Sequence, residues 1–469
     1  MEDVTGFRVE HDNIGGDVRV PRDAYYSAQT VRAVENFPFS GLRFGRAFLW
    51  ALGLVKAAAA QANTTLGLLD SLQGKAIVQA ATEVAEGRFD NQFVVDVFQT
   101  GSGTSTHMNA NEVIANRANE LLDDVKNDKV RIHPNDHVNI GQSTNDVFPT
   151  VIHVAALFLI EKRLLPALQV LAQSFSTKAI EFAAVVKAAR THLQDAVPIT
   201  LGQEFSGYTS VINHDISRIE KVKDHLTELP LGGTAVGTGL NAHPRFAELA
   251  IAELNFRSGL IFRQAENPFE AMQNRDACVE TSAALKTVAV GLMKVANDLR
   301  LLASGPRTGF AEIALPELQP GSSIMPGKVN PVIPEAVTMV AAQIIGNDLT
   351  ISVSALNGSL DLNVMMPVIA YNLLQSIEIE AAAARIFAKK CIQGITADVQ
   401  KCQGYAEASA ALITALAPTI GYENATRLFK RAMREEKSIR QIICEEQLLS
   451  TEQLDVILNL PALATDQRE

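Results

Sequence analysis

The chain has 469 residues, of which 47% are hydrophobic and 20% are charged, so it can form a large core and is not a disordered polymer. Its formal net charge of −11, without a run of Lys or Arg, disfavours binding to nucleic acid. No apolar run free of charges reaches the roughly 18 residues of a membrane span, and residues 1–6 lack the apolar core of a signal peptide. We therefore expect a cytoplasmic protein that binds neither membrane nor nucleic acid.

Helices are the expected elements along most of the chain. Aromatic residues make up only 6% of the sequence, and Ala and Leu recur throughout, which favours closely packed helices over a β-sandwich. The four cysteines, Cys278, Cys391, Cys402 and Cys444, form no CxxC pair and no cluster with His. This pattern is typical of free thiols in a reducing compartment and does not predict a zinc site.

In chain order, residues 1–40 are predicted to be extended and turn-like, and helical periodicity begins near Arg46. Polar stretches at 100–111 and 133–150 interrupt it. Helical patterns return at 151–189, with Pro166 as the candidate break, and at 269–304. The latter, as one helix, would be on the order of 50 Å long. Its apolar residues face several directions, so we expect other subunits to cover part of it, although a core helix within one monomer is the alternative.

Prolines and glycines mark a loop at 316–331, after which a helical pattern resumes around Pro334–Asn347 and a smaller helical region follows Pro367. We divide the chain into an N-terminal, mostly helical domain (1–140), a central domain of long bundled helices (141–366) and a small C-terminal helical domain (367–469).

The densest chemistry lies in the loop from Gly321 to Pro331. A phosphate-loop interpretation fails, because five residues separate Gly321 from Gly327 and Val329 stands where a Mg²⁺-binding Ser or Thr belongs. The glycines at 237 and 239 do not make a dinucleotide site either, since no apolar strand precedes them. The loop offers hydroxyls, a cation and an amide on a segment that could close over a substrate, and the apolar residues Ile324 and Met325 could anchor it.

Three further segments, 100–109, 133–146 and 190–195, are rich in Ser, Thr, Asn and His. Any one of these residues could simply cap a helix. Together they exceed what capping needs, and converging hydroxyl and amide donors beside helix N-termini suit a small carboxylate ligand.

These segments together resemble the fumarase/aspartase superfamily, and specifically the class II fumarases. Residues 321–331 match the signature Gly-Ser-Ser-x-Met-Pro-x-Lys-x-Asn-Pro, and the similarity extends over nearly the whole chain. The resemblance implies an all-α subunit of three domains, a homotetramer with a shared bundle of long helices, and active sites shared between subunits. It also implies a small dicarboxylate substrate and no metal or organic cofactor.

Roles for individual residues follow from the same resemblance. Ser322 is expected to exchange the C3 proton of malate, and His192, paired with Glu335 and acting through water, to handle the C2 hydroxyl. Lys328 and Asn330 would bind the carboxylate that becomes enolate-like. The rest of the dianion would contact Ser102, Thr104, Ser143, Thr144, Asn145 and Thr191. A second carboxylate site outside the active site is expected at His133, Asn135 and Asp136.

The expected reaction is the reversible hydration of fumarate to L-malate, by proton exchange at C3 and water addition or elimination at C2. Aspartate ammonia-lyase activity is the alternative, because Thr144, residues 332–334 and residues 360–365 lean toward aspartases, whereas Ser102 and Thr106 lean toward fumarases. A non-enzymatic protein recruited from the superfamily is a remote alternative, since such a protein need not keep Ser322, Lys328, His192 and Glu335 together. His107 is unusual for both enzyme branches, and an added imidazole near the site could alter its charge.

Overall fold

A computed structural model describes residues 6–11, 14–123 and 131–465 of the chain. It divides into two compact units, each considered by itself: unit 1 comprises 1–165, 217–287 and 342–380, and unit 2 comprises 166–216, 288–341 and 381–469. The prediction of no signal peptide rests on residues 1–6, most of which lie outside the described residues.

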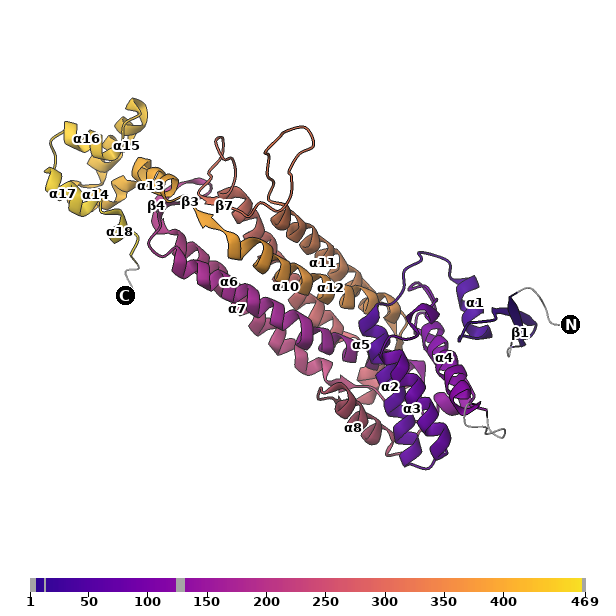
Figure 1. Cartoon of the computed structure of the whole chain (residues 1–469). Coiled ribbons are helices and arrows are strands. Elements are labelled where there is room, and N and C mark those ends of the chain that lie inside the picture. Colours follow the sequence, from indigo (N-terminus) through magenta and orange to yellow (C-terminus); the bar gives the residue numbers. More distant parts are fainter. Residues whose placement is uncertain (1–5, 12–13, 124–130, 466–469) are drawn as a thin grey trace. The chain divides into compact units, whose positions relative to one another are not determined.

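Helices dominate, as the composition predicts (Figure 1). The α-helices are α1 (Ala28–Asn36), α2 (Arg46–Thr65), α3 (Ser71–Ala85), α4 (Thr104–Asp123), α5 (Thr144–Leu159), α6 (Leu165–Glu181), α7 (Leu201–Leu226), α8 (Phe246–Ser258), α9 (Pro268–Gln273), α10 (Asp276–Leu302), α11 (Val332–Leu356), α12 (Met366–Ile386), α13 (Val399–Ala408), α14 (Ile413–Ile420), α15 (Tyr422–Glu435), α16 (Ile439–Glu445), α17 (Thr451–Ile457) and α18 (Leu460–Leu463). Short π or 3₁₀ turns are η1 (Asp90–Gln92), η2 (Pro134–Val138), η3 (Ile160–Leu164), η4 (Phe387–Cys391), η5 (Ile392–Gly394) and η6 (Ala410–Leu412).

Among the described residues, the strands form five small two-stranded sheets. Antiparallel pairs join β1 (Phe7–His11) to β2 (Asp17–Pro21), β3 (Val186–Thr191) to β4 (Gln194–Thr200), β7 (Ile313–Ala314) to β10 (Thr396–Ala397) and β8 (Gly358–Ser359) to β9 (Leu362–Asn363). The pair β5 (Glu228–Leu229) and β6 (Arg263–Gln264) is parallel.

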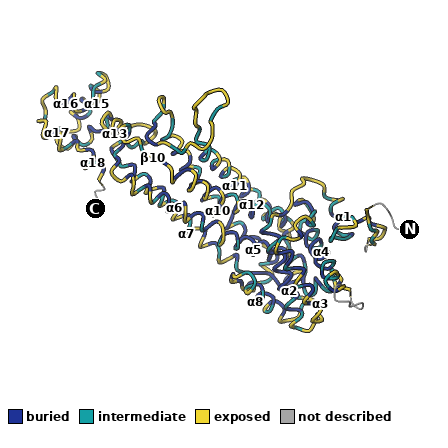
Figure 2. The backbone as a smooth tube through the Cα atoms, viewed as in Figure 1, coloured by how far each residue is buried: buried dark blue, intermediate teal, exposed yellow. Residues whose placement is uncertain are grey.

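The core of unit 1 is built around α2, which packs against α3, α5 and α8. Residues 57–60 of α2 are all alanine and all buried, and a Cβ on Gly53 would lie 2.5 Å from the backbone nitrogen of Ala85. Small side chains therefore let α2 and α3 approach closely, and Figure 2 shows both helices as largely buried.

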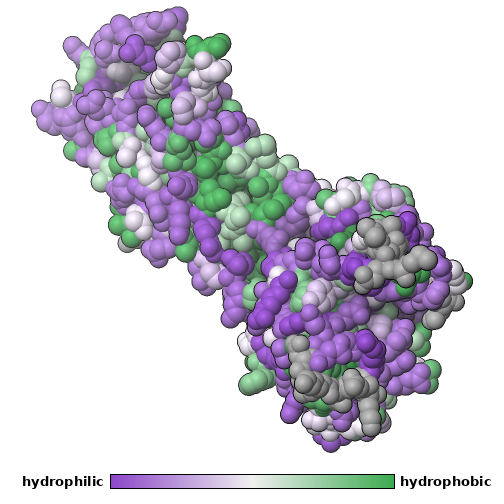
Figure 3. Space-filling model, turned by 45° about the vertical axis from the view of Figure 1, so that its right-hand side comes forward, coloured by the Kyte–Doolittle hydropathy of each residue, from purple (hydrophilic) through white to green (hydrophobic). Residues whose placement is uncertain are grey.

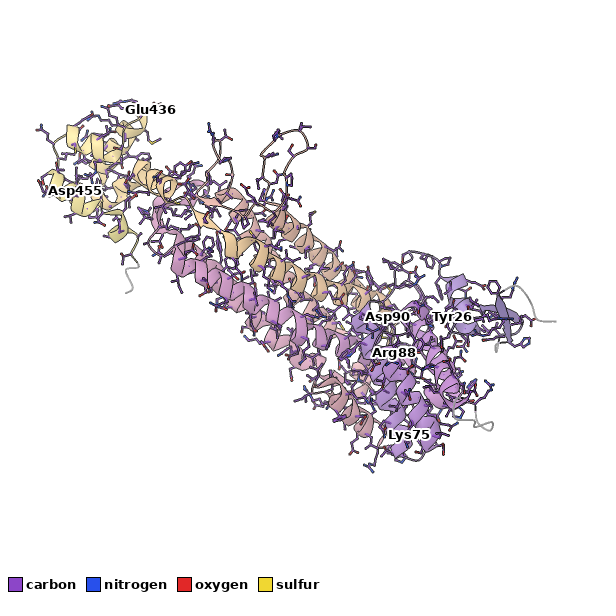
Figure 4. The ribbon with its side chains drawn as sticks, in the orientation of Figure 1. Tyr26, Lys75, Arg88, Asp90, Glu436 and Asp455 are labelled. Carbon is purple, nitrogen blue, oxygen red and sulfur yellow. The ribbon has the colours of Figure 1, made fainter. Side chains whose placement is uncertain are left out.

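Unit 2 contains an aromatic cluster and a separate C-terminal core. The rings of Phe175 and Phe182 pack edge-on or tilted against Phe205, with centroid separations of 6.0 and 5.3 Å. Leucines, isoleucines and alanines between 406 and 460 form their own apolar cluster. At the surface of this C-terminal region, Asp455, labelled in Figure 4, accepts a 2.6 Å hydrogen bond from Arg440.

Several sequence expectations are corrected by the structure. Helix α1 lies inside the stretch predicted to be extended, and α4 begins at Thr104, within the stretch predicted to interrupt the helices. The long pattern at 269–304 is broken into α9 and α10 at Asn274-Arg275. The pattern at 151–189 ends in strand β3 instead of continuing as helix. The loop at 316–331 is confirmed.

Candidate active site

Ser322 lies in the loop between β7 and α11, and its hydroxyl oxygen is surrounded by donors. The backbone N–H groups of Ile324 and Met325 donate to Ser322 Oγ at 3.2 and 3.0 Å. A hydroxyl oxygen that already accepts two hydrogen bonds is prepared to carry negative charge, because the same donors strengthen when the oxygen becomes an alkoxide. This geometry suits a serine that acts as a base.

The neck of the same loop is held by short contacts. The Gly321 N–H donates to the Lys328 carbonyl at 2.7 Å, and the Asn330 side-chain amide donates to the Gly321 carbonyl at 2.6 Å. A Cβ at 321 would lie 2.6 Å from the Lys328 carbonyl oxygen, so this position requires glycine.

The tip of the loop is open in the single chain. The Lys328 side chain is exposed and makes no ion pair with any described residue. Ile324 and Met325, the apolar residues that could anchor the loop, are 83% and 48% exposed in the single chain. The backbone of Lys328 is held at the neck of the loop, whereas its exposed ammonium is available to an anion.

His192 occupies the turn of the β3–β4 hairpin, directly after Thr191. His192 and Leu193 are the two central residues of the turn and have φ values of 58° and 59°. Positive φ at both positions is what a tight two-residue hairpin demands, and it is uncommon for side chains other than Gly, Asn and Asp. The chain thus holds the imidazole at an exposed tip at some conformational cost.

Glu335 lies in the first turn of α11 and contributes its backbone N–H to the Pro331 carbonyl at 3.1 Å. Within the part of one chain that the structure describes, its carboxylate makes no hydrogen bond to His192. The His192–Glu335 pair therefore stays a prediction for the assembled protein.

The hairpin that carries His192 is held by a buried ion-pair network at strand β3, which was not predicted from the sequence. The fully buried carboxylate of Glu312 accepts from Arg190 at 2.9 and 3.0 Å and lies 3.2 Å from the Lys187 ammonium. Lys187 also donates to Glu204 at 2.8 Å, and the Arg190 guanidinium lies over the Phe310 ring. The two cations Lys187 and Arg190 lie close together in the sequence and could have indicated a buried ion pair. Their partner Glu312 is remote in sequence, so the pairing could not be predicted.

In unit 1, Ser102 and Thr104 lie at the start of α4. Their hydroxyl oxygens are 2.8 Å apart and share a hydrogen bond. Gly103 between them has φ +86°, and a Cβ there would meet the Phe148 ring at 2.2 Å. Thr104 lines a cavity of about 260 Å³ together with residues that include Arg32 and Met108.

Ser143, Thr144 and Asn145 form the N-terminus of α5. Ser143 caps the helix in a reciprocal arrangement with Asp146, and its hydroxyl also accepts from the Asn145 N–H at 3.2 Å. The Asn145 side chain donates to the Ala235 carbonyl at 2.8 Å. Capping and ligand binding are compatible here, because a helix N-terminus presents unpaired N–H groups to an anion.

Beneath this helix start lies a group of buried ionisable side chains that sequence reasoning missed. Lys56 donates to Gln142 and Asn139 at 2.9 and 3.1 Å, and burial lowers its pKa well below the usual value while Asp146 acts in the opposite direction. Burial raises the pKa of Asp146 to about 6, although its carboxylate accepts three backbone N–H bonds. Lys56 lies in an alanine-rich helix, and its partners, which are remote in sequence, could not be predicted from the residues around it.

His107 contacts this group and is itself buried. Its Nδ1 lies 2.7 Å from Thr144 Oγ1. Burial, with a smaller contribution from the charge of Lys56, lowers the pKa of His107 well below its usual value. A lowered pKa favours the neutral form of the imidazole.

The proposed second carboxylate site forms one compact turn. His133 precedes η2, and its Nδ1 accepts from the Asp136 N–H at 3.2 Å and lies 3.1 Å from the Asp136 carboxylate. The His133 and Asp136 side chains are 51% and 76% exposed, and Asn135 lies between them on the same turn. The three residues are brought together at the surface of unit 1.

Two protein-family models match the chain. Residues 16–346 match the lyase family model, and residues 412–465 match the fumarase C C-terminus. The chain is 51% identical over 467 residues to the class II fumarate hydratase of Mycobacterium tuberculosis strain H37Rv, a match that covers 98% of this chain and 97% of the relative. The chain belongs to the class II fumarases. It is also 54% identical to the class II fumarate hydratase of Halobacterium salinarum, over 96% of each chain.

Solved structures of this class agree with the fold. The class II fumarase of Schistosoma mansoni has a TM-score of 0.94 at 40% identity and covers 98% of this chain and 99% of its own. The fumarate lyase:delta crystallin from Brucella melitensis, bound to cobalt, has a TM-score of 0.93 at 46% identity, over 98% of this chain and all of its own. The all-α fumarase fold predicted from the sequence is confirmed. The superfamily's other branch is also close, since aspartate ammonia-lyase of Bacillus subtilis is 49% identical over 97% of this chain and 95% of its own length.

Within this fumarase chain, the expected site residues fall into two groups. Unit 1 holds Ser102, Thr104, Ser143, Thr144 and Asn145, together with His133, Asn135 and Asp136. Unit 2 holds Thr191, His192, Ser322, Lys328, Asn330 and Glu335. The groups expected to move protons thus lie in unit 2, whereas the expected carboxylate donors are divided between unit 1 and the unit 2 residues Thr191, Lys328 and Asn330.

Proposed function

We propose that the chain catalyses the reversible addition of water to fumarate to give L-malate. The observation that carries this proposal is the Ser322 hydroxyl, whose oxygen accepts two backbone N–H bonds on the loop that also bears Lys328. The identity of 51% to 54% with class II fumarate hydratases over nearly the full chain supports the same activity.

In the malate-to-fumarate direction, Ser322 as the alkoxide removes the proton from C3. The electron pair left on carbon moves into the neighbouring C4 carboxylate, which becomes enolate-like with two negative charges. Lys328 and Asn330 bind this carboxylate, so their attraction is larger in the intermediate than in the substrate. The Ser322 oxygen is a sufficient base only because the Ile324 and Met325 N–H groups stabilise its anion.

The second half of the reaction breaks the C2–oxygen bond. The electron pair returns from the enolate to form the double bond, and the departing hydroxide takes a proton through a water held by His192. A carboxylate partner such as Glu335 would fix the imidazole tautomer and raise its basicity. Hydration of fumarate runs through the same steps in reverse, so every proton removed in one direction is returned in the other.

Residues of unit 1 and Thr191 would hold the rest of the dianion. Ser102, Thr104, Ser143, Thr144 and Asn145 present hydroxyl, amide and helix-N-terminal donors, which bind a carboxylate without a further full charge. His133, Asn135 and Asp136 are proposed as a second carboxylate site, because an imidazole and an amide are offered there on one exposed turn.

We further infer that the enzyme is a homotetramer with sites shared between subunits. In unit 1, Leu349, Val353 and Leu356 follow one another at helical spacing on α11 and are 66%, 48% and 83% exposed. The first two line an apolar groove of about 540 Å³ with Phe39 and Phe98. Figure 3 shows a patch of hydrophobic surface on one face of the molecule. Exposed apolar surface of this kind is typical of an interface.

Helix α11 is also long and apolar enough, by length and composition alone, to cross a membrane. We attribute its apolar face to contact with other copies of the chain, and we propose the cytoplasm as the location of the enzyme. The division into domains 1–140, 141–366 and 367–469 stays a prediction.

The experiment that tests the function is an assay of purified protein with L-malate and, separately, with L-aspartate. Fumarate is followed by its ultraviolet absorbance and ammonia by a coupled assay. We expect fumarate from malate and no ammonia from aspartate. Ammonia release from aspartate without malate turnover would contradict the proposal in favour of the aspartase branch, which the 49% identity to aspartate ammonia-lyases makes the specific alternative.

A further inference from the structure

His107 is a buried histidine to which the reaction described above assigns no role. It lies in α4, three residues after Thr104, and is 1% exposed. Its Nδ1 is 2.7 Å from the hydroxyl oxygen of Thr144 at the start of α5. This contact therefore joins the two segments of unit 1 that carry the proposed substrate-binding hydroxyls.

We propose that His107 is a positioning residue for substrate binding: its Nδ1–H donates to Thr144 Oγ1 and thereby turns the Thr144 O–H proton toward a carboxylate of the bound dicarboxylate. The inference rests on the proposed function, because it assigns a task to the same site. It concerns how the ligand is bound and not the proton transfer itself.

The argument begins with the hydroxyl group, which has one proton and accepts through its lone pairs. If Nδ1 carries the hydrogen, Thr144 must accept from His107, and its own proton is free to point at a ligand. If Nδ1 is bare, Thr144 donates to His107 and can offer only lone pairs, which repel a carboxylate. A dianionic ligand therefore selects the tautomer in which His107 donates.

The surroundings of His107 support a neutral ring with this one partner. Nε2 is buried and has no hydrogen-bond partner among the described residues. The nearby Lys56 is directed to the Gln142 and Asn139 side-chain oxygens, and Asp146 accepts from backbone N–H groups. Burial and the Lys56 charge both hold the His107 pKa low, so the ring contributes direction to a hydrogen bond without adding charge.

Three variants distinguish a His107 ring that only packs in the core from a ring that orients the Thr144 hydroxyl. His107→Leu keeps an apolar side chain but removes the donor. His107→Asn restores a short side chain with an N–H donor. Thr144→Val removes the hydroxyl that is being oriented, with little change in volume. Each is measured for fumarate turnover, for binding of succinate by calorimetry, and for thermal unfolding.

We expect His107→Leu to raise the KM for fumarate and the Kd for succinate by up to roughly 10-fold, because the Thr144 hydroxyl remains but loses the donor that orients it, while kcat changes far less. His107→Asn should restore most of the lost affinity. Combining His107→Leu with Thr144→Val should weaken succinate binding no further than Thr144→Val does alone. The reason is that Thr144→Val already removes the hydroxyl that His107 orients.

Unchanged succinate binding in a folded His107→Leu protein, or losses that add in the double variant, would overturn the proposal and leave His107 a packing residue. If His107→Leu does not fold, the Thr144→Val variant tests the proposal instead. Unchanged succinate binding by Thr144→Val would mean that the Thr144 hydroxyl does not bind the ligand, and the proposal would be wrong. Succinate binding needs no turnover. A wild-type protein that releases ammonia from aspartate but does not dehydrate malate would therefore contradict the proposed function while the role of His107 is still tested.

Discussion

At the scale of single residues, reactivity here depends on backbone groups as much as on side chains. Serine is a poor base in water because its alkoxide is unstable. The two N–H groups that reach Ser322 Oγ come from a turn of the loop whose neck requires Gly321. A four-residue segment thus supplies both the base and the donors that lower the energy of its anion.

Replacing Ser322 by Ala should lower kcat by several orders of magnitude, on the order of 10³-fold or more, because no other group would take the C3 proton. Helicity and assembly should be unchanged, since the loop tip is exposed and its amides can turn to water. Steady-state turnover, circular dichroism and light scattering measure these quantities. A kcat close to that of the wild type would remove Ser322 from the role of base.

At the scale of elements, the hairpin of β3 and β4 places His192 and is itself held by charges. Glu312 is fully buried between the Lys187 ammonium and the Arg190 guanidinium, 3.2 and 2.9 Å away. Removing the charge of Glu312 leaves Arg190 without an ionised partner and Lys187 with Glu204 alone. Breaking a buried ion pair in this way is strongly destabilising, because a buried charge loses its compensation.

Glu312→Gln should therefore destabilise unit 2 by about 3 to 5 kcal/mol and reduce activity through displacement of the hairpin. The matched control is Glu86→Gln, whose ion pair with Arg88 is 2.8 Å long but largely exposed and should change stability by less than about 1 kcal/mol; Arg88 is labelled in Figure 4. Urea unfolding of both variants gives the comparison. Equal midpoints would mean that the buried network does not hold the hairpin.

At the scale of the whole molecule, the proposed tetramer can be tested by mixing defective subunits. If the 190–195 and 321–331 segments of one site come from different subunits, a refolded equal mixture of His192→Asn and Ser322→Ala subunits contains sites with neither change. Random assembly would make about a quarter of the sites intact. We expect roughly that fraction of wild-type turnover, compared with each variant refolded alone as the control. If the turnover of the mixture is no higher than that of each variant refolded alone, the His192 and Ser322 of one active site come from the same subunit.

The sequence by itself determined the helical class, the loop at 316–331 and the family, because these depend on local composition and on short motifs whose residues are adjacent. Hydrophobic spacing also located α2 and the body of α11. The segments rich in hydroxyls and amides could be recognised for the same reason: their chemistry is visible without knowing what they contact.

Only the tertiary structure decided the β3–β4 hairpin and the buried ionisable group of Lys56, His107 and Asp146. Alanines beside Lys187 and Arg190 are typical of a helix, and these cations are buried only because Glu312 lies against them, 122 residues after Arg190. The low pKa of His107 likewise becomes visible only once its burial and the nearby Lys56 are known. The energy of a buried charge depends on partners brought together by the fold, and neither propensity nor periodicity contains that information.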